Sequence, residues 1–236
     1  MELIERIKRD FTFHFDELKG LAIATLVLAF VFTFREWSLI NLFYAILIIA
    51  LSLIVHISAQ KIVGLHLGVK VEFKLWWYGL LASLIAVFLS NGRVWWIIVP
   101  GGFITSIIAK YRLGKFRYGL GYHLMGVVGL TGPVASIILG SIFKNINLYT
   151  PITSPLLDKV FVFNLVYAVF SLLPIPPLDG HYTFFAGRLT FAFVAGSIVV
   201  YCLLILLLGV YSFIWALIGG GIIYILYYTL FERKAW

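Results

Sequence analysis

Apolar residues run in long blocks along this chain, and polar residues are confined to short stretches between the blocks. An apolar block of about 20 residues is long enough to cross a lipid bilayer as a helix, so the pattern predicts a bundle of membrane-spanning helices. Eight blocks are visible in the sequence, at residues 20–34, 38–60, 75–90, 94–108, 121–143, 159–178, 189–208 and 211–230.

The third and fourth blocks give the weakest signal. Only Asn91-Gly92-Arg93 separates them, and Pro100-Gly101-Gly102 interrupts the second of the two. Residues 75–108 are therefore expected to form either two short spans or a re-entrant hairpin, which enters the membrane and returns on the same side. Both arrangements leave the orientation of the other spans unchanged.

The composition agrees with the pattern. The chain is 62% hydrophobic and 12% charged, with a mean hydropathy of +1.04, whereas a soluble domain is about 45–50% apolar and about 25% charged. The sequence therefore predicts an all-α polytopic membrane protein with about six to eight transmembrane helices. An N-terminal arm (1–19) would precede one membrane domain (20–230) and a short tail (231–236).

Basic residues are unevenly divided between the two ends of the predicted helices. With the N-terminus inside, 14 of the 18 Lys and Arg residues fall on inner segments, and the outer four are Arg35, Arg93, Lys144 and Lys159. Basic loops are typically cytoplasmic, so both termini are predicted to be cytoplasmic, in a plasma-membrane protein. This distribution explains the net charge of +8 without a nucleic-acid partner, and the expected partner is the lipid bilayer.

A polar face interrupts the second block near its end, in VHISAQKIVG (55–64). His56 and Gln60 are four residues apart and share one face of the predicted helix, with Ser52 one turn earlier. Such a face is commonly a hydrogen bond between membrane helices, so this segment alone specifies no site. The blocks 38–60 and 159–178 both run from outside to inside. His56, near the end of the first, and Asp179, just after the second, are therefore predicted to lie at the same depth in the membrane.

The sixth block ends in LLPIPPLDG (172–180). Three prolines in four residues cannot continue a regular helix, and broken backbone at membrane depth must lie within protein or line a wet cavity. Asp179 places an ionisable group at the break, and such groups inside membranes are typically functional. The alternative is a cytoplasmic turn, because Pro-x-x-Asp-Gly is a common turn sequence.

A third segment, GLTGPVASIILG (129–140), carries small residues at four-residue spacing, namely Gly132, Ser136 and Gly140. This spacing allows close packing of membrane helices, and Pro133 is suited to the first turn of a helix. Helix packing alone is sufficient to explain this segment.

Together the three segments resemble the site-2 protease family of intramembrane zinc metalloproteases. That family has H-E-x-x-H on one transmembrane helix, a G-P-x-x-N segment, and N-x-x-P-x-x-P-L-D-G, whose Asp is the third zinc ligand. This chain matches at His56, at Gly132-Pro133, and from Pro174 through Pro177 and Asp179 to Gly180. The stretch at 72–81 and the PGG at 100–102 also resemble a branch of the family. The likeness covers most of residues 15–185, and a core of about 38–185 is expected.

The chain departs from the family pattern at the positions that carry the chemistry. Ile57 stands in place of the catalytic Glu, and Gln60 in place of the second zinc-binding His. The resemblance therefore implies no catalytic residue and only two vestigial metal ligands, His56 and Asp179. The positions it implies around a polar cavity are Ser52, Gly132, Pro133, Ser136, Asn164, Ser171, Pro174, Pro177 and Gly180, with Ser136 and Ser171 at the Asn positions of the family.

These observations favour a protein that has lost peptidase activity, has no bound metal, and binds or regulates the transmembrane segments of other proteins. The first alternative is an active zinc metalloprotease with a rebuilt site, made of His56, Asp179 and one further histidine out of His66, His123 and His181. The second alternative is a small transporter or channel, although the sequence shows no internal repeat of the kind common in transporters.

Overall fold

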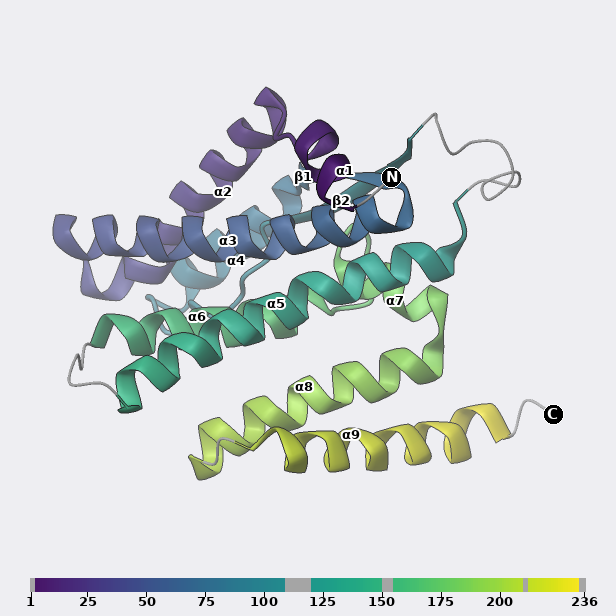
Figure 1. Cartoon of the computed structure of the whole chain (residues 1–236). Helices are drawn as coiled ribbons and strands as arrows, with labels where there is room; N and C mark the ends of the chain where they lie inside the picture. The colour runs from purple at the N-terminus through teal and green to yellow at the C-terminus, as the bar shows by residue number, and fades with distance from the viewer. Residues whose placement is uncertain (1–2, 109–119, 150–154, 210–211, 234–236) are drawn as a thin grey trace.

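A computed structural model describes residues 3–108, 120–149, 155–209 and 212–233 of the chain (Figure 1). The basic loop at 110–117 and the end of the tail, 234–236, lie outside the described residues. In chain order the elements are α1 (Leu3–Asp10), α2 (Phe15–Thr33), η1 (Phe34–Glu36), α3 (Leu39–Leu67), β1 (Val69–Leu75), α4 (Trp77–Leu89), β2 (Gly101–Ile107), α5 (Tyr122–Tyr149), α6 (Pro155–Ser171), α7 (Asp179–Ala186), α8 (Arg188–Leu208), α9 (Phe213–Tyr227) and η3 (Tyr228–Glu232).

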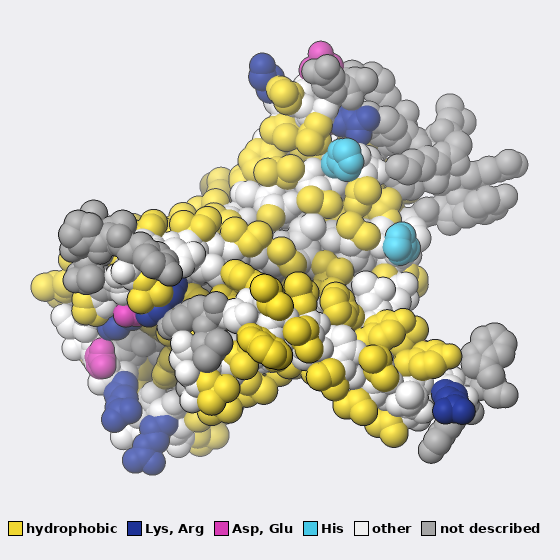
Figure 2. Space-filling view, turned by 60° about the horizontal axis from the view of Figure 1, so that its bottom comes forward, with side chains coloured by type: hydrophobic (Ala, Val, Ile, Leu, Met, Phe, Trp, Pro, Cys, Tyr) yellow, Lys and Arg dark blue, Asp and Glu magenta, His cyan; other side chains and the backbone are white. Residues whose placement is uncertain are grey.

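Five helical segments are long and apolar enough to cross a membrane, which confirms the predicted all-α membrane class. They are Phe15–Glu36, Leu39–Leu67, Tyr122–Leu148, Arg188–Ile205 and Phe213–Glu232. α6, with 17 residues, is at the lower limit for a span. α3, α5, α8 and α9 run roughly side by side (Figure 1), and hydrophobic side chains cover much of the face seen in Figure 2.

Residues 94–108 do not form the helix that one reading of the sequence predicted. α4 has only 13 residues, and the chain then returns through an extended segment into β2, which pairs antiparallel with β1 from Val69↔Ile107 to Leu75↔Gly101. Residues 69–107 are therefore a two-stranded ribbon with one short helix at its tip, which is the in-and-out path of the hairpin alternative.

Local sequence explains this ribbon. α3 ends where Gly68 adopts a left-handed conformation, with φ of 89°, which glycine reaches without steric cost. β1 then buries Val69, Val71 and Phe73, while charged residues occupy the alternate positions. This period of two is typical of a half-buried strand. On β2, a Cβ at Gly102 would overlap the carbonyl oxygen of Pro177, so the ribbon lies directly against the proline-rich loop.

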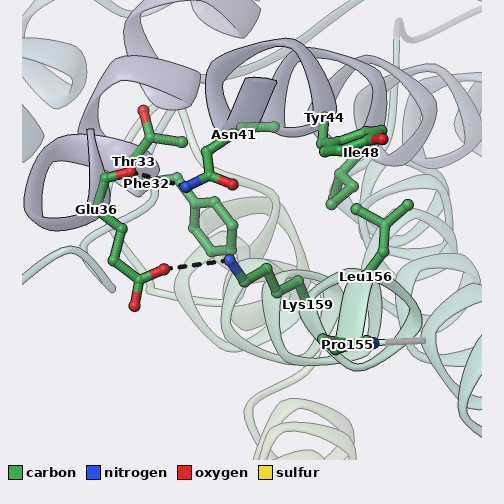
Figure 3. Close-up of a pocket in the computed structure, with 10 residues that line it drawn as sticks. Phe32, Thr33, Glu36, Asn41, Tyr44, Ile48, Pro155, Leu156 and Lys159 are labelled. Carbon is green, nitrogen blue, oxygen red and sulfur yellow. Dashed lines mark hydrogen bonds and ion pairs between the residues drawn. The ribbon is translucent and has the colours of Figure 1, made fainter. Parts of the chain in front are cut away.

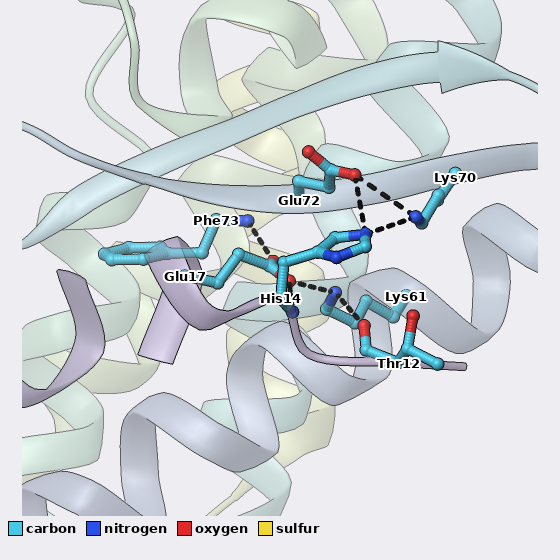
Figure 4. Close-up of polar contacts among 7 residues, drawn as sticks. All are labelled: Thr12, His14, Glu17, Lys61, Lys70, Glu72 and Phe73. Carbon is cyan, nitrogen blue, oxygen red and sulfur yellow. Dashed lines mark hydrogen bonds and ion pairs between the residues drawn. The ribbon is translucent and has the colours of Figure 1, made fainter. Parts of the chain in front are cut away.

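A buried ion pair fixes α2 and the ribbon to α3 (Figure 4). Lys61 Nζ donates to Glu17 Oε2 at 2.9 Å, and both side chains are only 4% exposed. The second carboxylate oxygen, Glu17 Oε1, accepts from the backbone N–H of Phe73 at 2.6 Å, and Lys61 also donates to the Thr12 carbonyl at 2.9 Å. Since each charge is paired and hydrogen-bonded, the burial is tolerated.

α8 and α9 form a hairpin that packs against α5, α6 and α7 along one side of the bundle (Figure 1). α9 contributes little to the core: only 11% of its apolar window is buried. Its glycines at 219 and 220 allow close contact with α8, where a Cβ would lie 2.7 Å from Val200 Cγ1 or would overlap Ser197 Oγ. The rest of its surface faces outward.

Candidate functional site

Three side chains predicted from the motifs meet in the interior of the bundle. His56 Nε2 lies 2.7 Å from Asp179 Oδ2, and His56 Nδ1 lies 2.9 Å from Ser136 Oγ. The exposed fractions of the three residues are 2%, 3% and 0%. A neutral imidazole that donates from Nε2 to the carboxylate and accepts from the serine hydroxyl at Nδ1 satisfies both bonds. The histidine is thus held by both ring nitrogens.

Asp179 reaches this point because the chain breaks after α6. α6 ends at Ser171, and Pro174, Pro176 and Pro177 prevent its continuation. The backbone turns back so closely that a Cβ at Gly180 would overlap the Leu172 carbonyl. Leu178 is 1% exposed and anchors the turn, and Asp179 becomes the first residue of α7. Pro174, Ile175 and Pro176 remain exposed, so the segment is a surface turn, and only its end, from Leu178 to Gly180, enters the protein interior.

Gln60 and Gly132 complete this buried cluster. Gln60 is one helical turn after His56 and is 2% exposed. A Cβ at Gly132 would overlap His56 Nε2 and lie 2.7 Å from Gln60 Nε2, so the absence of a side chain there lets α5 approach α3. Gln60 Nε2 is buried without a hydrogen-bond partner among the described residues.

Ile57, at the position of the catalytic Glu in the resembled family, belongs to the apolar core. It is 2% exposed and packs in a cluster with Leu53, Ile49 and Phe163. An apolar side chain in an apolar cluster cannot accept a proton. Ile57 therefore serves in the packing of the core.

Asn164 has a larger structural role than the sequence suggested. Asn164 Nδ2 donates to Ser52 Oγ at 2.9 Å, from α6 to α3, and the side chain is fully buried. This bond lies on the same face of α3 as His56, one turn earlier. Ser171, in contrast, bonds the carbonyl of Ala168 in its own helix at 3.0 Å. Ser52 and Asn164 therefore support the cluster from one side, and within the described residues the Ser171 hydroxyl makes no hydrogen bond to it.

Tyr167 is a neighbour of the cluster that the sequence did not reveal. Its ring centroid lies 4.5 Å from that of His56, and the residue is 2% exposed. Tyr167 follows Asn164 by one turn of α6, so a periodicity argument from Asn164 could have found it.

Pro133 lies in the interior of α5, and the prediction that it begins a helix is wrong. α5 starts at Tyr122 and continues through the proline. The carbonyl of Gly129, four residues earlier, loses its helical donor because proline has no N–H. Membrane helices tolerate such a residue when their neighbours supply packing, and here Gly129 lies against the backbone of Asp179, whose carbonyl oxygen would be 2.8 Å from an added Cβ.

The candidate replacement histidines do not join His56 and Asp179. His66 and His123 are exposed, at the end of α3 and the start of α5. His181 makes an edge-to-face contact with Phe185, with the ring centroids 4.8 Å apart, and its Nδ1 is buried without a hydrogen-bond partner among the described residues. Among the described residues, no three side chains of His, Cys, Asp or Glu gather in a way that could hold a metal ion.

The residues present do not fit a protease zinc site. Two tetrahedral zinc ligands at about 2.0–2.2 Å from the metal lie about 3.3 Å apart, whereas His56 Nε2 and Asp179 Oδ2 are in direct hydrogen-bond contact at 2.7 Å. The third ligand position holds Gln60, a neutral amide that suits hard cations better than zinc.

The Ser136–His56–Asp179 chain has the residue types of a serine hydrolase but lacks its arrangement. In hydrolases the serine bonds Nε2 and the aspartate bonds Nδ1, and here the two nitrogens are exchanged. Ser136 Oγ belongs to a fully buried residue, so a substrate carbonyl has no path to it. The cluster is a hydrogen-bonded junction of α3, α5 and α7.

Comparison with known proteins finds one relevant relative. Over 173 residues, which are 72% of this chain and 84% of the relative, the sequence is 27% identical to a Methanocaldococcus jannaschii protein named "Putative zinc metalloprotease MJ0611". The chain is therefore related to a protein that carries the name of a zinc metalloprotease. No family model matches the chain, and no solved structure matches it. The relationship supports the metalloprotease part of the resemblance drawn from the motifs.

Proposed function

We propose that this chain is a site-2 protease-like membrane protein that no longer hydrolyses peptide bonds and instead binds transmembrane segments of other proteins. The observation that carries the proposal is the direct hydrogen bond between His56 and Asp179. The two retained ligand positions satisfy each other, and the third holds Gln60.

The loss of the general base supports the same conclusion. In zinc proteases a glutamate takes the proton of the attacking water, and a positioned general base contributes about 10²- to 10⁴-fold to rate. Ile57 is in the apolar core and cannot perform that step. The hydrogen-bonded cluster would then serve as a rigid centre that holds three helices in place.

An apolar groove along α5 is suited to a membrane partner. A cavity of about 310 Å³ lies between α5 and the α8–α9 hairpin, and its lining includes Val134, Ile138 and Phe193. Val134 and Ile138 are 41% and 53% exposed. An apolar helix of a partner protein would bury these side chains. In this arrangement both termini of the chain lie on the cytoplasmic side of the plasma membrane, as the distribution of basic residues predicts.

Photocrosslinking in the membrane tests this function. A photoreactive residue is placed at Ile138 on α5 and, as a control, at Leu47, which is 52% exposed on α3. The proposal expects intact membrane proteins to be captured from position 138 and not from 47, with no effect of a metal chelator. Cleaved fragments of partner proteins that no longer form when the chelator is added would contradict the proposal and establish proteolysis.

An active metalloprotease with a rebuilt site is the second candidate. Two observations favour it: the relative is named as a zinc metalloprotease, and His181 Nδ1, two residues after Asp179, has no hydrogen-bond partner among the described residues. A shift of α7 would have to bring His181 to His56. The chelator-dependent cleavage described above distinguishes the two candidates.

A further inference from the structure

Six charged side chains gather around two adjoining cavities at the end of the bundle that carries the α2–α3 and α5–α6 connections. This end lies opposite the N and C labels of Figure 1, and Figure 2 shows basic and acidic side chains collected there. The cavities measure about 310 and 350 Å³ and share Phe32, Glu36 and Lys159. The six charged residues are Arg35, Glu36, Arg93, Lys144, Asp158 and Lys159, and the sequence places no other charge in these connections.

Four of the six charges neutralise one another in pairs. Lys159 Nζ lies 3.3 Å from Glu36 Oε2 (Figure 3), and Lys144 Nζ lies 2.7 Å from Asp158 Oδ1. Arg35 and Arg93 remain, and neither side chain has a hydrogen-bond or ion-pair partner within the described part of the chain, although the backbone N–H of Arg93 donates to the Ser90 carbonyl at 3.2 Å. The six side chains together therefore carry a net charge of +2, and both arginines line the larger cavity.

The backbone places the two arginines beside each other. Arg35 is in η1, and Arg93 is in the turn that follows α4. Between them, Gly92 has a φ of 77°, and a Cβ there would lie 3.0 Å from Arg35 Cβ. Gly92 N donates to the Val87 carbonyl at 2.8 Å, so the turn is held in this position. The backbone thus brings two positive side chains to one cavity, where like charges repel each other, and a bound anion would relieve the repulsion.

We propose that this cavity binds a phosphate group, and that its occupant is the headgroup of an anionic phospholipid. Guanidinium groups match phosphate with paired, charge-assisted hydrogen bonds. Trp95 and Phe32 line the same cavity and offer apolar contact to the glycerol and acyl part of a lipid. Tryptophan is also typical of the membrane–water interface. Inorganic phosphate could make the same hydrogen bonds but would make no apolar contact with Trp95 and Phe32.

Native mass spectrometry of the full-length protein in non-ionic detergent tests this site. The protein is titrated separately with phosphatidylglycerol, phosphatidylcholine and inorganic phosphate. The variants are Arg35→Gln, Arg93→Gln and the double variant, and the matched control is Arg233→Gln, an exposed arginine near the C-terminus. Arg35 and Arg93 are themselves exposed, so equal thermal unfolding of the variants is expected and is measured alongside.

We expect wild type to retain one phosphatidylglycerol molecule. The double variant should bind it at least about tenfold more weakly, because charge-assisted hydrogen bonds are lost. The affinity of Arg233→Gln for phosphatidylglycerol should equal that of wild type. Phosphatidylcholine should bind more weakly than phosphatidylglycerol, because the two arginines repel its choline cation. Equal phosphatidylglycerol binding by wild type and double variant would overturn the site. Equal binding of the two lipids, or arginine-dependent binding of inorganic phosphate alone, would overturn the anionic lipid as its occupant.

Discussion

The side chains of His56 and Asp179 are 123 residues apart in the chain and in direct contact in the structure, Nε2 to Oδ2, at 2.7 Å. They come from the second half of α3 and the start of α7, and Ser136 of α5 bonds the other ring nitrogen. One imidazole therefore joins three helices. Substitutions at these and neighbouring residues distinguish a structural junction from a metalloprotease site.

Changing either hydrogen-bond partner of His56 should destabilise the fold, to different extents. Asp179→Asn keeps the size of the side chain and replaces a charge-assisted bond with a neutral one, so the free energy of unfolding in detergent should fall by about 1–3 kcal/mol. Ser136→Ala removes a neutral bond and should cost about 0.5–1.5 kcal/mol. Chemical unfolding followed by circular dichroism measures both. A cost of Ser136→Ala above that of Asp179→Asn would contradict the geometry.

Gly132 is the position at which α5 touches α3. Gly132→Ala would place a methyl group onto His56 and close to Gln60, and the overpacking should cost about 1–3 kcal/mol of stability. Gly221→Ala on α9 is the matched control, because nothing lies within 4 Å of a Cβ there. The same unfolding assay should show no loss for the control. If both variants unfold alike, α3 and α5 are not in close contact at Gly132.

The Glu17–Lys61 pair should be far more important than its exposed neighbour. Glu17→Gln leaves Lys61 buried without a counter-charge, and breaking a buried pair typically costs about 3–5 kcal/mol. Asp16 and Lys19, on the same helix, form a pair of 3.7 Å with side chains 96% and 56% exposed. Asp16→Asn should therefore cause no measurable change. Thermal unfolding of the two variants compares them directly, and equal midpoints would disprove the buried pair.

The sequence located the site but not the ribbon beside it. Orientation and helix order predicted His56 and Asp179 at one depth, because hydropathy and the distribution of basic residues are strong signals in membrane proteins. β2 was read as part of an apolar helix, because periodicity alone does not separate a short apolar strand from a buried helix segment. The alternation of charged and apolar residues in β1 carries the strand signal, but it lies between two apolar blocks, where a connecting segment is expected.

Other features needed three dimensions. Nothing in the spacing of Ser52 and Asn164 shows that they bond across two helices at 2.9 Å. Tyr167 is one aromatic residue among many in an apolar helix until its ring lies against His56. The sequence predicts a helix start at Pro133, because the preference of proline for the first turn is known from water-soluble helices. A membrane helix packed against its neighbours can continue through a proline.

The central claim is that Gln60 and Ile57 deprive a metalloprotease-like site of its metal and its base. The most direct test is the zinc content of the purified protein, measured by mass spectrometry, for wild type, Gln60→His, and Ile57→Glu with Gln60→His. The account predicts no zinc in wild type and about one per chain in both variants, because the histidine supplies the third ligand. Asp179→Ala added to Gln60→His should remove it. Stoichiometric zinc in wild type that is lost on His181→Ala would contradict the account and identify a rebuilt, metal-binding site.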